Sequence, residues 1–146
     1  MIYSLPVTLL IALLTIGLLV TIHEAGHFFV ARWFGVRVLR FSVGFGYPLW
    51  RWRDRCQTEY ILAMIPLGGY VRMLDSREQT LDTGQLSQAF DQQGVWTRIA
   101  IVAAGPLTNL VFAVLAYSLV FMLGFTQLVP VTSSPPANSV AAQVGI

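Results

Sequence analysis

The sequence has no lysine, one cysteine and two histidines among its 146 residues. Charged residues make up 11% of it, about half the share found in ordinary soluble domains, whereas hydrophobic residues make up 55%. The single cysteine, Cys56, excludes an internal disulfide. Apart from Glu24, all charged side chains lie from Arg32 to Arg98. This distribution excludes an ordinary soluble domain, and the net charge of +2 indicates no nucleic-acid partner.

Two apolar stretches, from about Leu5 to Ala31 and from about Ile99 to Phe125, exceed the roughly 20 residues needed to cross a bilayer. The arginine-rich segment between them is then cytoplasmic, with both termini on the opposite face. A cleaved signal peptide fits poorly, because the first stretch lacks a basic n-region and an A-x-A site. We therefore expect an α-helical membrane protein with spans at 1–31 and 99–125, a cytoplasmic-side loop at 32–98 and an extracytoplasmic segment at 126–146.

The loop between the spans has strand-like segments rich in β-branched and aromatic residues. They predict a small β-hairpin or sheet beside the membrane, with a natural break at residues 44–48 and a separating glycine pair at 68–69. In the second span, Pro106 indicates either a kink or the true start of the helix. The predicted strands are 36–43, 58–66 and 70–74, and a short helix is predicted around 86–92.

The most specific motif is His23-Glu24-Ala25-Gly26-His27, an H-E-x-x-H pattern inside the first apolar stretch. Residues four apart share one face of a helix, so His23 and His27 can bind one zinc ion from adjacent turns. Glu24 would not ligate the ion, but would act as general base on the water that zinc activates. Ionisable groups in a membrane span are costly and usually functional. The alternative is that the three side chains only hydrogen-bond one another within a polar helix bundle.

A catalytic zinc site ordinarily has three protein ligands, and this sequence has no third histidine. Asp54, Glu59 and Asp75 are loop carboxylates, and Asn109 in the second span is a poor zinc ligand. None fits the role well, so we expect the third ligand to come from sequence outside this chain. Three other functions stay open: a metal transporter, a catalytically incomplete membrane scaffold, and a di-iron oxidase, which needs more histidines.

Four motifs in order resemble the site-2 protease family of intramembrane zinc metalloproteases. They are HEAGH at 23–27, GFG at 44–46, IPLGGYV at 65–71 and AGPLTN at 104–109. The resemblance covers nearly the whole chain. It implies a bacterial inner-membrane enzyme that contacts lipid and uses Zn²⁺ to cleave transmembrane segments of membrane proteins. The implied process is regulated proteolysis of the anti-sigma-factor type.

The resemblance also implies roles for particular residues. Gly44, Phe45 and Gly46 would belong to a membrane-re-entrant β-hairpin that binds substrate, and Asn109 would face the catalytic cavity and position substrate. Taken without the family, the two glycines favour an ordinary tight turn, and Asn109 fits a bond to a neighbouring helix equally well. The family further implies a PDZ domain from about residue 135 and a third zinc ligand in an L-D-G motif on a later span. The chain has no such motif and ends without a turn or charged tail, which indicates truncation.

Overall fold

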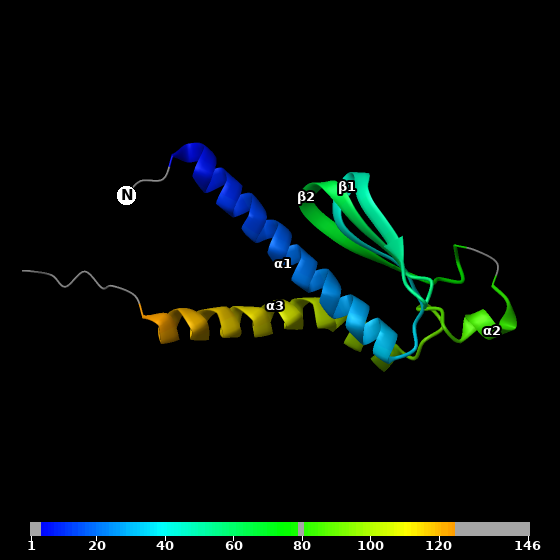
Figure 1. Ribbon diagram of the computed structural model, residues 1–146. Coiled ribbons are helices and arrows are strands. Elements are labelled where there is room, and N and C mark those ends of the chain that lie inside the picture. The colour runs from blue at the N-terminus through cyan, green and yellow to red at the C-terminus, as the bar shows by residue number, and fades with distance from the viewer. Residues whose placement is uncertain (1–3, 79–80, 125–146) are drawn as a thin grey trace, which may run out of the picture. The chain divides into compact units, whose positions relative to one another are not determined.

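The computed structural model describes residues 4–78 and 81–124. Along the chain these residues form two long helices, with a two-stranded antiparallel sheet and a short helix between them (Figure 1). The chain divides into two compact units, 1–116 and 117–146, and the first holds every residue of the candidate site. The elements are α1 (Leu5–Trp33), β1 (Val38–Arg53), β2 (Glu59–Met73), α2 (Thr83–Leu86) and α3 (Val95–Leu123).

Helix α1 confirms the first predicted apolar helix and extends it by two residues. Ser4 is the N-cap and Pro6 lies in the first turn, where its missing N–H costs nothing. Arg32 in the last turn complements the helix dipole, and Gly35, at φ 77°, follows the end of the helix. The 29 residues span about 43 Å, more than the roughly 30 Å of a bilayer core.

Helix α3 shows whether Pro106 lies inside the second apolar helix or at its start. The helix begins at Val95, so Pro106 lies inside it and does not mark its start. The missing N–H at Pro106 leaves the carbonyl of Val102 without its usual helical donor. By length and composition, both α1 and α3 can cross a membrane.

The predicted three strands are wrong in number, because the structure has two long ones that each bend in the middle. The first half of β1 pairs with both halves of β2, one on each side, and the second half of β1 pairs back onto the first half of β2. The curled hairpin therefore presents four paired segments. Their order across the sheet is 69–73, 38–43, 59–62 and 48–53.

The predicted break at residues 44–48 is also wrong, since β1 continues through it. Gly44 and Gly46 adopt φ of 88° and 86°, which lets the strand bend without ending. A Cβ on Gly44 would stand 2.7 Å from the carbonyl oxygen of Ile65. Gly68 and Gly69 likewise lie within β2 and do not separate two strands.

The short helix predicted around 86–92 is misplaced, because α2 ends at Leu86. Tertiary contacts hold the following segment in a different conformation. Phe90 donates its N–H to the carbonyl of Leu74 at 2.7 Å, and Ala89 and Leu74 are fully buried. This backbone bond ties the segment after α2 to Leu74, the residue that follows β2.

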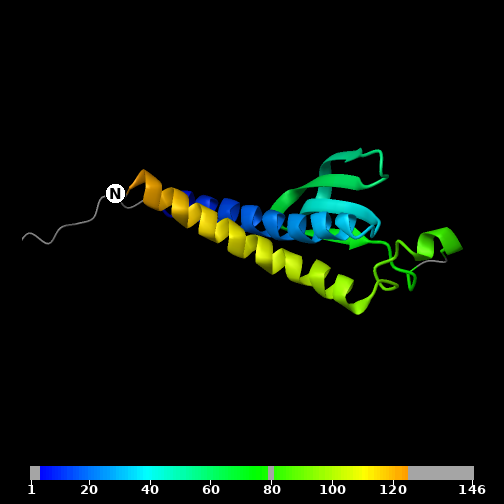
Figure 2. The same ribbon diagram turned by 90° about the horizontal axis from the view of Figure 1, so that it is seen from below.

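The core of the first unit joins both helices to the hairpin. Phe28, Ala31, Val36, Val38 and Ile101 are buried together, with Phe41 and Tyr60 packed against them. In Figures 1 and 2, α1 lies between the hairpin on one side and α3 on the other. The arrangement brings the middle of α1 against both neighbours.

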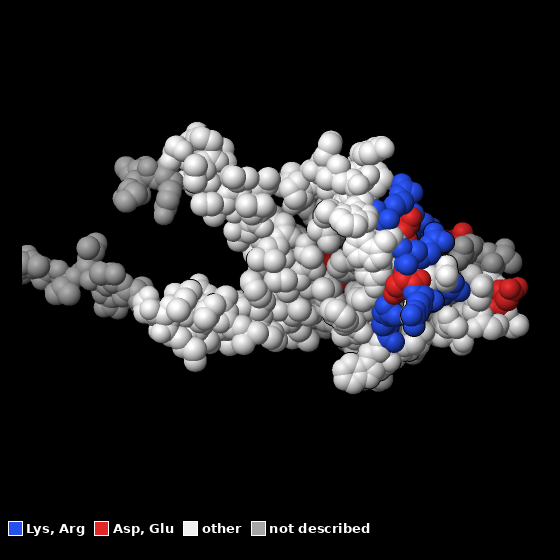
Figure 3. Space-filling view, in the orientation of Figure 1, with Lys and Arg blue, Asp and Glu red and all other residues white. Residues whose placement is uncertain are grey.

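Nearly all charged side chains on the visible face gather toward the end where α1 stops, around the ends of the hairpin strands and out to α2 (Figure 3). Arg32 pairs with Asp54 at 2.9 Å and Arg40 with Glu59 at 2.7 Å. Burial raises the pKa of Asp54, but hydrogen bonds from the Thr58 amide and the Arg32 guanidinium outweigh it and hold the pKa below its ordinary value. On α1 itself, the first arginine after the motif is Arg32, which lies a little more than one helical turn beyond His27.

Candidate metal centre

His27 is held by the backbone of α3. Its Nδ1 lies 2.7 Å from the carbonyl oxygen of Ile101. A carbonyl only accepts hydrogen bonds, so Nδ1 carries the proton and donates it. In the neutral ring the lone pair is then on Nε2. This is the tautomer that a metal ligand at Nε2 requires.

His23 lies one turn earlier on α1 and contacts the side chain of Asn109 on α3. The Asn109 Nδ2 and the His23 Nδ1 are 3.3 Å apart. The two imidazole rings are close to each other, with centroids 4.8 Å apart and an interplanar angle of 82°. Both rings are thus contacted at Nδ1 by α3, at positions eight residues apart.

The Nε2 atoms of both histidines converge on Gly105. A Cβ on Gly105 would stand 2.7 Å from His23 Nε2 and closer still to His27 Nε2. The helices are also close at Gly26, where a Cβ would stand 2.6 Å from the carbonyl oxygen of Ala104. Glycine at both positions therefore lets α1 and α3 approach closely, and at 105 it lets the α3 backbone lie against the two Nε2 atoms.

Glu24 faces β2 and opens onto a cavity. Its Cγ would lie 3.5 Å from a Cβ on Gly69. Glu24 and His27 both line a cavity of about 460 Å³ between α1, α3 and the end of β2. A water molecule needs only a small fraction of this volume. The carboxylate and one imidazole thus share a space that water can enter.

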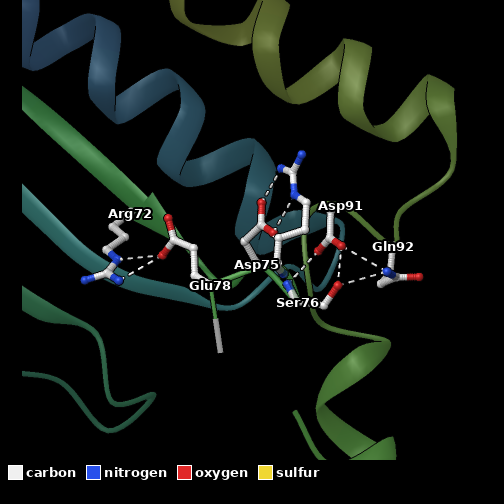
Figure 4. Close-up of polar contacts among 7 residues, drawn as sticks. Arg72, Asp75, Ser76, Glu78, Asp91 and Gln92 are labelled. Carbon is white, nitrogen blue, oxygen red and sulfur yellow. Dashed lines mark hydrogen bonds and ion pairs between the residues drawn. The ribbon is translucent and has the colours of Figure 1, made fainter. Parts of the chain in front are cut away.

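The cavity continues to a charged rim, whose contacts are drawn in Figure 4. Arg72 and Glu78 pair at 2.8 Å and both line the cavity, as does Asp75. Asp75 accepts hydrogen bonds from the Arg77 side chain and amide, which hold its pKa at about 2. The Ser76 hydroxyl donates a hydrogen bond to the Asp91 carboxylate, and the Gln92 side-chain amide donates another to it. The rim is therefore polar, unlike the exposed apolar surfaces of α1 and α3.

Residues 11–144 match the sequence model of peptidase family M50. The chain belongs to peptidase family M50. Among similar proteins, the regulator of sigma-E protease RseP of Escherichia coli K12 is 50% identical over 134 residues, which are 92% of this chain and 30% of that protein. The protein named "Putative zinc metalloprotease" in Vibrio cholerae is 48% identical over the same share of each chain. The M50 chain thus spans about a third of the length of the relatives it matches.

The histidine pair of this M50 chain fits a zinc ion in donor chemistry. Neutral imidazole is a good zinc ligand, and the His27 tautomer leaves Nε2 free to bind. Within residues 4–78 and 81–124, no three His, Cys, Asp or Glu side chains form a group able to hold a metal. The loop carboxylates have other partners, since Asp54 pairs with Arg32, Glu59 with Arg40 and Asp75 with Arg77. The described residues therefore offer two candidate ligands, His23 and His27.

The GFG segment of the M50 chain lies apart from the histidines. Gly44, Phe45 and Gly46 line a separate cavity of about 210 Å³ in the bend of the hairpin. Phe45 stacks on Tyr70, with ring centroids 6.3 Å apart. Tyr70 follows Gly69, against which Glu24 lies. The structure thus brings His23, Glu24, His27 and Asn109 together, and it places GFG apart from them, in contact with β2 through Phe45 and Tyr70.

Sequence reasoning missed three positions of the M50 site: Gly69, Ile101 and Gly105. The Ile101 contribution is a backbone carbonyl, which no side-chain pattern reveals. Gly105 was noted only as part of the AGPLTN motif, without a role of its own. The signal was present in AGPLTN, because a glycine four residues before a polar side chain in an apolar helix indicates one face that another element approaches closely.

Proposed function

We propose that the protein is a membrane-embedded zinc endopeptidase that hydrolyses peptide bonds within transmembrane segments of other membrane proteins. The observation that supports this most directly is the convergence of both His Nε2 atoms beside Gly105, with Glu24 on the adjoining cavity. The family and the names of the relatives support the peptidase class and the metal. His23 and His27 are the proposed zinc ligands.

Glu24 is the proposed general base and acid. Zinc, when bound, supplies Lewis-acid polarisation and lowers the pKa of water. Glu24 takes the proton from the attacking water and returns it to the leaving amine. Its position supports this role, because the Glu24 side chain borders both the cavity and Gly69 of β2.

The substrate must leave its helical conformation before cleavage, because the carbonyls of a transmembrane helix are already hydrogen-bonded. We propose that it binds as an extended strand along the outer segment of β2, residues 69–73, which lies nearest Glu24. Such strand addition supplies backbone hydrogen bonds. Gly44, Phe45, Gly46 and Asn109 are proposed to contact the substrate as well.

We propose that the hairpin enters the membrane beside α1. Two observations support this. A Cβ on Gly17, in the charge-free half of α1, would stand 2.6 Å from the carbonyl oxygen of Pro66. The bend of the hairpin also exposes large apolar side chains, namely Phe45, Tyr47, Leu49, Met64, Ile65 and Leu67. An exposed apolar surface of this kind is typical of membrane contact.

The orientation follows from the arginines. We propose that residues 32–98 lie on the cytoplasmic side of a bacterial inner membrane and that both termini of the segment are on the outer side. A third zinc ligand outside this chain and a PDZ domain from about residue 135, beyond the described residues, complete the proposal. The substrate class is a membrane protein of the anti-sigma-factor type.

The decisive experiment compares the full-length protein with its Glu24→Gln variant in proteoliposomes that contain a transmembrane substrate. We expect stoichiometric zinc in both proteins and loss of cleavage by at least about 10³-fold in the variant, since the base acts directly on the reacting water. Undiminished cleavage by Glu24→Gln rejects this mechanism. Zinc transport into the same vesicles, without cleavage, supports a transporter instead.

A further inference from the structure

The side chain of Asn109 has an unsatisfied atom beside His23. Asn109 Oδ1 is buried and has no hydrogen-bond partner among the described residues, whereas Nδ2 lies 3.3 Å from His23 Nδ1. A buried amide oxygen that accepts no hydrogen bond destabilises the folded state. The oxygen and nitrogen of an asparagine amide have nearly the same shape, so the bonding network decides which one faces the ring.

The neighbouring His27 indicates how that network runs. Its Nδ1 donates to the Ile101 carbonyl, and its Nε2 lies free beside Gly105. His23 presents its own Nε2 to the same glycine. For His23 to ligate through Nε2 in the neutral form, its proton must be on Nδ1, and Nδ1 then needs an acceptor. The amide nitrogen of Asn109 is a donor and cannot serve.

We propose that Asn109 accepts a hydrogen bond from His23 Nδ1 through Oδ1, and so positions His23 as a zinc ligand. The amide is turned over relative to the orientation in which Nδ2 faces the ring. Asn109 then does for His23 what the Ile101 carbonyl does for His27, and one helix fixes the tautomer of both imidazoles. Asn109 is a positioning residue in this role, and the inference rests on the proposed zinc site.

The choice between the two amide orientations can be tested with an isosteric variant. The substitution Asn109→Asp keeps the shape of the asparagine side chain but leaves only acceptor oxygens. A carboxylate at this position satisfies a donor at His23 Nδ1 and repels a lone pair there. Asn109→Leu removes both the donor and the acceptor. Partners that orient a metal-ligating histidine typically contribute 10–100-fold to metal affinity.

The experiment measures zinc affinity of the full-length protein in detergent by competition with a chromophoric chelator, without reference to peptidase activity. Asn109→Leu should bind zinc 10–100-fold more weakly than the unmodified protein, and Asn109→Asp should remain within about 3-fold of it. Thr15→Val, at an exposed position of α1 whose hydroxyl bonds only to the Ile11 carbonyl among the described residues, is the matched control for loss of a polar group and should leave the affinity unchanged. The visible spectrum of the Co²⁺-substituted protein should change in Asn109→Leu and persist in Asn109→Asp.

Each other outcome is decisive. An unmodified protein without stoichiometric zinc overturns the proposed function and this inference with it. Zinc in the unmodified protein together with full affinity in Asn109→Leu overturns only the inference. Equal weakening by the Leu and Asp variants shows that the amide donates to His23, which also overturns it. Thermal unfolding of each variant in detergent separates loss of folding from loss of the hydrogen bond.

Discussion

The carbonyl oxygen of Pro66 lies directly against Gly17, where a Cβ would stand only 2.6 Å from it. This contact fixes the hairpin along the half of α1 that carries no charge. A Gly17→Leu substitution should push the hairpin away, with an overpacking cost of about 1–3 kcal/mol. We expect a lower unfolding temperature in detergent and reduced cleavage of membrane substrates. Leu18→Ala, at an exposed neighbouring position, is the control. An unchanged unfolding temperature in Gly17→Leu contradicts the packing described here.

Gly105 should tolerate no side chain. A Cβ there would stand 2.7 Å from His23 Nε2, so Gly105→Ala must displace at least one imidazole. We expect zinc affinity to fall by about 10–100-fold, as it does when the support of a ligand is lost. The control is Gly84→Ala, because nothing lies within 4 Å of a Cβ at that position. Equilibrium dialysis with zinc measures both variants. Equal affinity in the two variants means that the Nε2 atoms do not bind at Gly105.

Phe45 should affect substrate use without affecting the metal. Its ring stacks on Tyr70 and lies beside Gly68. Both residues belong to β2, which passes Glu24 of α1 at Gly69. We expect Phe45→Ala to reduce kcat/KM for a transmembrane substrate by about 10-fold, which corresponds to about 1.4 kcal/mol, with unchanged zinc content. Tyr47→Ala, at a side chain that is 73% exposed, is the control. A loss of zinc in Phe45→Ala assigns the residue to stability of the site instead.

The Asp75 carboxyl should make the rim of the cavity sensitive to acid. The Arg77 side chain and amide lower the pKa of Asp75 from 3.8 to about 2. A pKa that is lower in the folded state contributes stability that is complete above the unfolded value and is lost as the pH falls toward the folded one. The rim should therefore loosen between pH 3.8 and about 2. The ¹³C chemical shift of the Asp75 carboxyl reports its titration.

In the same titration, Arg77→Gln should raise the pKa of Asp75 toward 3.8. Arg72→Gln is the matched control, because Arg72 pairs with Glu78. If Asp75 titrates identically in the unmodified protein and in Arg77→Gln, the ion pair between Arg77 and Asp75 does not hold in solution. The contacts of Asp75 are drawn in Figure 4.

The sequence alone was sufficient for the features that depend on local periodicity. The two helices follow from apolar runs, and the helical spacing of four residues places His23 and His27 on one face. The GFG segment was harder, because glycine permits both a turn and a bend within a strand, and only pairing across the sheet decides between them. The hydrogen bond from His27 to the Ile101 carbonyl joins residues that are 74 apart in the sequence, so no local pattern predicts it. Asn109 was recognised as a site residue through a family resemblance, but its partner depends on how two helices pack.

Both imidazoles are contacted from a single helix, at Ile101 and Asn109, with Gly105 between. A slide of that helix along its axis by even part of one turn separates both rings from their acceptors at once. In the proposed zinc site, the affinity for the metal would therefore depend on the position of α3 along α1 through both histidines together.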